Sequence, residues 1–125
     1  MRTPEILQLI QDVAAEVITP RFKELRSDEI LEKNPGDFVT VADRQAEERL
    51  TEQLRAAYPQ AFILGEEATF ENPALLDELA NASHAFTIDP IDGTGNFVKG
   101  NADHAVMVAE LRDGELTRSW IWRLV

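Results

Sequence analysis

The segment Thr87–Phe97, TIDPIDGTGNF, places two aspartates, Asp89 and Asp92, three positions apart at the end of an apolar run. Because proline fixes its own φ angle, Pro90 predicts a stiff turn that directs both carboxylates and the Ile91 carbonyl toward one point. Two carboxylates this close raise each other's pKa unless a cation lies between them. Oxygen ligands of this kind suit Mg²⁺, so the segment predicts a magnesium site.

The next two residues, Gly93 and Thr94, extend this prediction to a phosphate. Glycine lets the backbone approach a ligand closely, and the amides of Gly93 and Thr94 would face an anion if a helix or turn begins here. The Thr94 hydroxyl could also hold a water molecule. Together these groups would equip the chain for metal-assisted phosphoester hydrolysis. On spacing alone, an ordinary Asx turn explains the segment equally well.

Three further carboxylates stand where strands end or helices begin. Glu66 and Glu67 follow the apolar run FILG, and Asp43 follows the β-rich stretch DFVTVA. Ligand sites collect at such positions in mixed α/β proteins. Each carboxylate also has a structural explanation, because the glutamates could be a solvated strand end and Asp43 could form a capping box with Thr40.

The hydrophobic pattern predicts an α+β fold in which two longer helices pack on a mostly antiparallel sheet. The first helix covers residues 3–20, with Thr3 as its cap and residues 22–25 as a potential continuation. The second covers residues 44–58. A turn at NPGD, short strands at EILEK, AFIL and HAFTID, a short helix at NPALLDELANA and a final hairpin that turns at Asp113-Gly114 complete the predicted elements.

The composition limits the ligands and partners that the chain can bind. The 125 residues include no cysteine and carry a net charge of −11, from 23 acidic and 12 basic residues. Thiolate metal sites and disulfides are therefore excluded, and a nucleic-acid polymer is an unsuitable partner. Neither a signal pattern nor an apolar run of membrane-spanning length is present, so we expect a cytoplasmic protein that binds no membrane.

Three motifs together resemble the inositol monophosphatase family. DPIDGTGNF at residues 89–97 matches the family signature, GEE at residues 65–67 stands upstream of it, and DFVTVAD at residues 37–43 is similar to a third family segment. Three motifs in this order are far more specific than any one of them. The resemblance implies the layered α-β-α-β-α fold of the sugar phosphatases, of which residues 1–125 would be the N-terminal domain.

The resemblance also implies a role for each residue of the motifs. Two or three Mg²⁺ ions, for which Mn²⁺ can substitute, would bind in the complete enzyme, which is lithium-sensitive and expected to be a homodimer. The implied metal ligands are Glu66, Asp89, the Ile91 carbonyl and Asp92, with Glu67 as a partner behind them. Gly93 and Thr94 would bind the substrate phosphate through their amides, and Thr94 and Asp43 would orient and activate the attacking water.

The expected reaction is hydrolysis of a phosphate monoester of a small sugar or cyclitol, with an inositol monophosphate as the leading substrate. Histidinol phosphate, fructose bisphosphate and 3′-phosphoadenosine 5′-phosphate are alternative substrates. The family's Trp-Asp-x-Ala segment, which gives another aspartate to the second metal, is absent from the 125 residues. We therefore expect the chain alone to be inactive, and a non-catalytic module that binds metal or anions is the alternative function.

Overall fold

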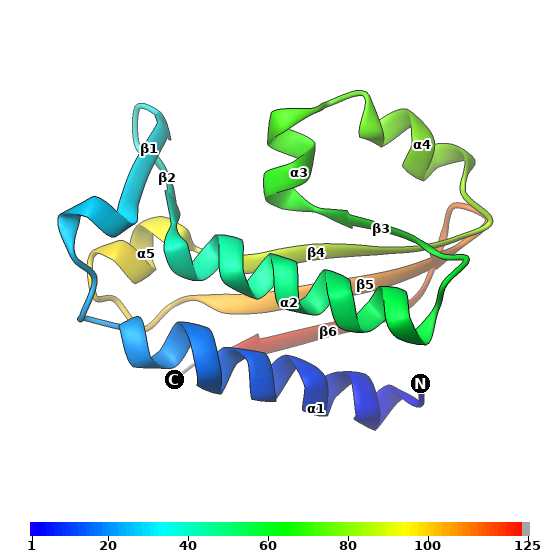
Figure 1. Ribbon diagram of the computed structural model, residues 1–125, viewed down its shortest axis with the longest axis horizontal. Helices are drawn as coiled ribbons and strands as arrows, with labels where there is room; N and C mark the ends of the chain where they lie inside the picture. Colours follow the sequence, from blue (N-terminus) through cyan, green and yellow to red (C-terminus); the bar gives the residue numbers. More distant parts are fainter. Residues whose placement is uncertain (124–125) are drawn as a thin grey trace.

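The main sheet has four strands in the order β3-β4-β5-β6 (Figure 1). The computed structural model describes residues 1–123. Strand β3 runs parallel to β4, whereas β5 and β6 continue the sheet in antiparallel pairs, which confirms the predicted mostly antiparallel sheet. The strands are β3 Phe62–Gly65, β4 His84–Asp92, β5 Ala105–Arg112 and β6 Glu115–Arg123. Positive φ angles at Asp113 and Gly114 form the predicted turn between β5 and β6.

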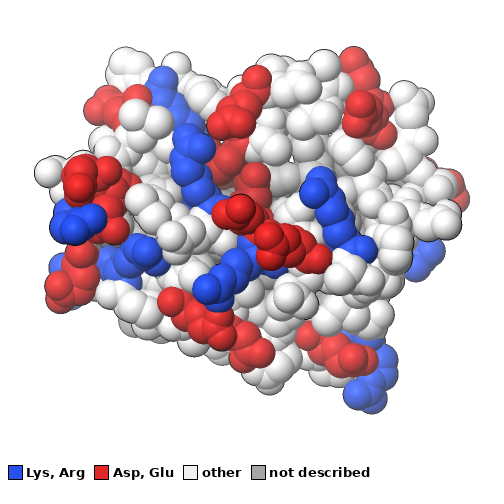
Figure 2. Space-filling model, in the orientation of Figure 1, with Lys and Arg blue, Asp and Glu red and all other residues white. Residues whose placement is uncertain are grey.

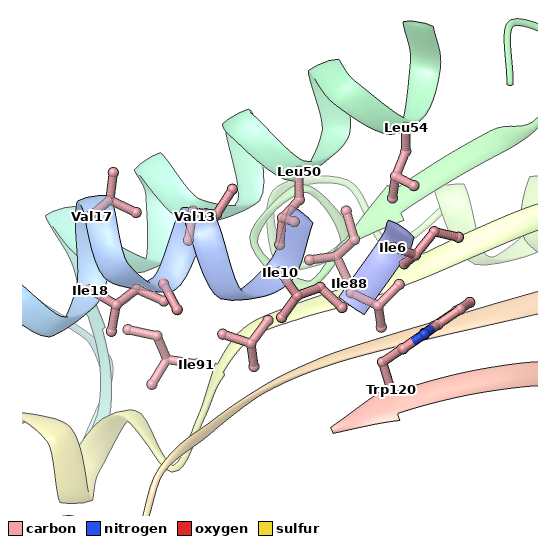
Figure 3. Packing of buried hydrophobic residues seen from close by; sticks show 14 of the residues in the cluster. Ile6, Ile10, Val13, Val17, Ile18, Leu50, Leu54, Ile88, Ile91 and Trp120 are labelled. Atoms are coloured by element: carbon pink, nitrogen blue, oxygen red, sulfur yellow. The ribbon is translucent and has the colours of Figure 1, made fainter. Parts of the chain in front are cut away.

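Two helices cover one face of this sheet (Figure 1). Helix α1 spans Thr3–Val13 and continues through the π-helical turn η1, Ala14–Ile18, and the 3-10 turn η2, Thr19–Arg21. Helix α2 spans Val41–Ala57. Figure 3 shows how their apolar side chains meet the sheet, in a core that includes Ile6, Ile10, Val13, Leu50, Leu54, Ile88, Ile91 and Trp120.

The start of the first helix differs from the prediction, whereas its end lies within one residue of the predicted position. Arg2, rather than Thr3, occupies the capping position, and Glu5 accepts a hydrogen bond of 3.0 Å from the Arg2 amide. The C-terminal end lies at Arg21, because Phe22 is already extended and residues 22–25 do not continue the helix. Pro20, which removes a backbone donor, lies in the final 3-10 turn.

Shorter elements connect the strands and helices of the main sheet and its cover. The 3-10 turn η3, Ser27–Glu29, leads into a separate hairpin of β1, Ile30–Asn34, and β2, Asp37–Thr40. Helix α3, Glu66–Glu71, follows β3 directly, and α4, Leu75–Asn81, precedes β4. Helix α5, Thr94–Val98, follows β4 and lies beside β2 in Figure 1.

The surface carries mixed charges on one face and exposed apolar side chains on the final hairpin. Figure 2 shows acidic and basic side chains interspersed over the face that carries α1 and α2. In the final hairpin, Leu116 and Ile121 are each 63% exposed, and an apolar groove of about 360 Å³ beside them reaches Asp89. Among the residues that the structure describes, no helix is long and apolar enough to span a membrane.

Candidate active site

A β-bulge aligns the two aspartates of the opening segment. Asp89 pairs with Met107 and Asp92 pairs with Ala105, so β4 contains one more residue than β5 between these pairs. Residues that pair directly share a sheet face, and Met107 and Ala105 lie on the same face of β5. Asp89 and Asp92 therefore also share a face. The predicted stiff turn was wrong, because a bulged strand, with Pro90 inside it, positions the carboxylates.

The chain turns away from the sheet at Gly93. Its φ of 87° is left-handed, and a Cβ atom there would lie 2.8 Å from the carbonyl oxygen of Asp103. Both facts favour glycine. Thr94 begins α5 immediately afterwards, as the sequence predicted for a helix or turn at this point.

Thr94 connects this segment to the start of α2. Its hydroxyl oxygen lies 2.9 Å from Asp43 Oδ1 and 2.9 Å from the Ile91 carbonyl oxygen. The second oxygen of Asp43 accepts hydrogen bonds of 2.7 Å from both the amide and the hydroxyl of Thr40. Asp43 thus forms the expected capping box and also contacts Thr94, so its two interpretations are compatible.

The two glutamates open a helix rather than extending a strand. Glu66 and Glu67 are the first residues of α3, and only Glu67 is buried. Glu67 Oε2 lies 3.3 Å from the Lys33 ammonium group, which comes from β1 and is itself almost fully buried. Lys33 is thus a cation at the edge of the carboxylate cluster, which we define as Asp43, Glu66, Glu67, Asp89 and Asp92.

The charges of the carboxylate cluster oppose one another. Although much of Glu66 is exposed, desolvation of its carboxyl group and hydrogen bonding with Asp89 raise the pKa of Glu66 to about 7. Desolvation also raises the pKa of Asp89, and the negative charges of Asp92 and Asp43 act in the same direction. Burial raises the pKa of Asp43 despite its bonds to Thr40 and Thr94. Raised carboxylate pKa values mark a place where added positive charge would be stabilising.

The donor groups of the cluster fit a divalent cation. Asp89 Oδ1 is buried and, among the described residues, has no hydrogen-bond partner. Within residues 1–123, no three acidic or histidine side chains lie close enough together to hold one metal ion, so a cation here would bind one or two carboxylates at a time. This arrangement suits Mg²⁺, which takes one or two carboxylates and retains several waters.

The sequence analysis missed two residues that contact the site. Lys33 pairs with Glu67, and Glu47 accepts hydrogen bonds from the amides at the start of α3. Glu47 follows Asp43 by four positions, which is the spacing of neighbours on one helix face, so a signal for it was present. His104 is buried against the rings of Phe22 and Phe97.

The fold and site define an α+β domain whose acidic cluster lies at the carboxyl ends of its parallel strands. The model of the inositol monophosphatase family matches residues 3–124, and the chain belongs to this family. It is 34% identical to the Nus factor SuhB of Pseudomonas aeruginosa over 85% of this chain and 43% of that protein. It is 36% identical to an inositol-1-monophosphatase of Rhizobium meliloti over 76% of this chain and 34% of that protein.

Solved structures confirm the fold. An IMPase from Thermotoga maritima superposes with a TM-score of 0.78 at 25% identity, covering 96% of this chain and 42% of that one. An IMPase/NADP phosphatase complexed with Mg²⁺ and phosphate gives a TM-score of 0.71 at 25% identity, over 97% of this chain and 44% of that one. The chain thus spans less than half the length of these relatives.

Proposed function

We propose that the chain carries the metal- and phosphate-binding part of a Mg²⁺-dependent phosphate monoesterase. The observation that carries this proposal is the unpartnered, buried oxygen of Asp89, which lies in a cluster where the pKa values of Glu66 and Asp89 are raised. Like charges are held together here at a cost to stability, and functional sites are where such arrangements concentrate. A related IMPase/NADP phosphatase was solved with Mg²⁺ and phosphate, which supports Mg²⁺ and phosphate as the groups that bind here.

The proposed ligands are Glu66, Asp89 and the Ile91 carbonyl for one ion, and Asp89 and Asp92 for a second. Divalent ions bound there would supply Lewis-acid activation of water and would offset the charge of the phosphoryl oxygens. Glu67, held by Lys33, would stabilise the start of α3 behind these ligands. The amides of Gly93 and Thr94 would bind the substrate phosphate.

Asp43 and Thr94 have the geometry of a proton relay. Thr94 would take a proton from the attacking water while passing its own proton to Asp43 Oδ1, 2.9 Å away. Hydrogen bonds from Thr40 hold the other oxygen of Asp43, which leaves Oδ1 free to accept. The raised pKa of Asp43 suits a general base better than that of an ordinary aspartate.

We propose an inositol monophosphate as the substrate of the complete enzyme, on the basis of the relative named inositol-1-monophosphatase. Relatives named fructose-1,6-bisphosphatase/inositol-1-monophosphatase make a sugar bisphosphate the second substrate to test. We also expect the complete enzyme to be a homodimer. We expect it to contain another aspartate that binds the second metal and that is absent from these 125 residues. The chain alone would accordingly bind metal but would hydrolyse the substrate slowly.

The test combines calorimetry and phosphate release. Titration of the chain with Mn²⁺ or Mg²⁺ should give heat that Glu66→Gln and Asp89→Asn each reduce. Phosphate release from inositol 1-phosphate should be slow, and joining the chain to the remaining segment of a relative should increase it. Binding without turnover in that chimera would favour the non-catalytic module. Titration heat that neither substitution changes would refute the proposed site.

A further inference from the structure

Helix α3 starts without a capping side chain of its own. Its N-cap residue is Gly65, and Glu66, the first helical residue, is a proposed metal ligand. The carboxylate of Glu47, from α2, takes the place of the missing cap. It accepts hydrogen bonds of 2.8 Å from the amide of Glu67 and 3.2 Å from that of Ala68. These are the N2 and N3 amides that a local cap normally satisfies.

The glycine at position 65 is fitted to this contact. A Cβ atom on Gly65 would lie 2.0 Å from the carboxyl carbon of Glu47. The backbone itself does not require glycine, because its φ of −94° and ψ of 158° are open to any residue. The space taken by the Glu47 carboxylate therefore explains why a side chain is excluded here.

One helix holds both halves of the candidate site. Asp43 and Glu47 are four residues apart and so lie on the same side of α2. Asp43 contacts Thr94 after β4, whereas Glu47 contacts the start of α3 after β3. The same side of α2 is anchored in the core by Ala46, Leu50 and Leu54, all of which are fully buried. The helix can therefore set the distance between the two ligand-bearing segments.

We propose that Glu47 is a positioning residue, which fixes the start of α3 so that Glu66 meets Asp89 at the metal site. Glu47 acts through backbone amides and touches neither metal nor substrate. The inference rests on the proposed function, since it takes Glu66 to be a metal ligand. Partners that orient metal ligands contribute about 10- to 100-fold to metal affinity, and Glu47 belongs among them.

Two substitutions should remove this contact by different routes. Glu47→Ala deletes the carboxylate, and Gly65→Ala displaces it. Each should increase hydrogen exchange at the Glu67 and Ala68 amides about fivefold, as expected for a lost helix cap. Each should also weaken Mn²⁺ binding about tenfold by calorimetry. Glu47→Gln, which keeps one acceptor, should fall between wild type and Glu47→Ala. Glu48→Ala, at the exposed neighbouring position, is the matched control and should change neither measurement.

A double substitution separates positioning from a general loss of stability. Once Glu47→Ala has vacated the space, Gly65→Ala should add little further loss of Mn²⁺ affinity, because its backbone angles suit alanine. Additive losses in the double variant would overturn the inference. Faster amide exchange with unchanged Mn²⁺ affinity would also overturn it, since Glu47 would then hold the helix without placing the ligand.

Failure of the proposed function would look different. If Glu66→Gln left Mn²⁺ binding unchanged, Glu66 would not be a ligand, and the positioning role would be refuted. If Asp89→Asn also left it unchanged, the proposed site would be refuted as well. If Glu66→Gln weakened binding while Glu47→Ala and Gly65→Ala did not, the site would stand and only the inference about Glu47 would fail.

Discussion

The carboxylate cluster and a second cluster, Glu110 with its hydrogen-bonding partners, lie toward opposite ends of β4 and β5 and have opposite electrostatics. At the carboxyl end of β4, the carboxylate cluster holds an unpartnered Asp89 oxygen and carboxyl groups of raised pKa. Toward the other end, Glu110 on β5 is 2% exposed, and its oxygens accept hydrogen bonds from Arg118, His84 and Thr117. Bonds from Arg118, more than any other contact, lower the pKa of Glu110 to about 2.

The difference separates a structural role from a functional one. Glu110 is satisfied by its own chain, so its charge stabilises the fold without any ligand. The carboxylate cluster has Lys33 as a cation at its edge but leaves one oxygen of Asp89 without a partner, so added positive charge would stabilise it. A buried polar group that a native fold leaves unsatisfied requires such an explanation.

The largest effect should come from breaking the satisfied cluster. Glu110→Ala leaves Arg118 and His84 without their shared acceptor, so the free energy of unfolding should fall by about 3 kcal/mol. Urea denaturation followed by circular dichroism measures this loss. Glu115→Ala, on the same hairpin but exposed, should change stability by less than about 0.5 kcal/mol. A similar small change for Glu110→Ala would mean that the two clusters do not differ as described.

Removing one charge from the carboxylate cluster should have the opposite effect on the metal-free protein. Asp89→Asn removes like-charge repulsion, so the thermal midpoint without metal should rise. The same substitution should lower Mn²⁺ affinity by about 100-fold or more, because a residue proposed to bind both ions is lost. Calorimetry and thermal melting with and without Mn²⁺ test both effects. Asp113→Asn, in the β5–β6 turn, serves as the control and should alter neither quantity.

The two clusters should also give opposite pH dependence. The pKa of Glu110 is lowered from 4.5 to about 2, so its contribution to stability is present above pH 4.5 and is lost as the pH falls toward 2. The pKa of Glu66 is raised from 4.5 to about 7, so its contribution is present below pH 4.5 and is lost as the pH rises through 7.

Urea midpoints measured from pH 3 to pH 8 without metal should therefore pass through a maximum and decline toward neutral pH. Glu66→Gln should reduce the decline of the urea midpoint toward neutral pH. Saturating Mn²⁺ should make the midpoint rise with pH over the same range. Midpoints that keep rising from pH 5 to pH 8 in metal-free wild type would contradict the raised carboxylate pKa values.

The smallest effect should come from Lys33, the cation of the carboxylate cluster. Its contact with Glu67 is longer than the Arg118–Glu110 contact, at 3.3 Å against 2.7 Å. Glu67 can also take up a proton when its partner is lost, because burial raises its pKa. Lys33→Gln should thus reduce the free energy of unfolding by only about 1 kcal/mol. Lys99→Gln, at an exposed lysine, is the reference in the same urea assay.

Local sequence signals predicted much of the fold and of the candidate site. The features that were predicted depend on residues that are near one another in sequence. They are the capping box of Thr40 and Asp43, the two-residue turn at Asp113-Gly114, and the core faces of α1 and α2. Helix ends were less predictable. At the N-cap Arg2 and at the start of α3, backbone amides donate hydrogen bonds to the side chains of Glu5 and Glu47, and periodicity does not reveal such contacts.

The sequence by itself determined which residue types are available for the proposed chemistry, because the motifs at residues 37–43, 65–67 and 89–97 contain nearly all the oxygen ligands that the proposed magnesium site needs. Only the tertiary structure decided how they meet. The bulge that puts Asp89 and Asp92 on one face arises from pairing with β5, a register that no local pattern specifies. The hydrogen bonds of Glu47 to the start of α3 and of Arg118 to Glu110 likewise join residues that are separated in the chain. Such contacts exist only once the helices and strands have packed together.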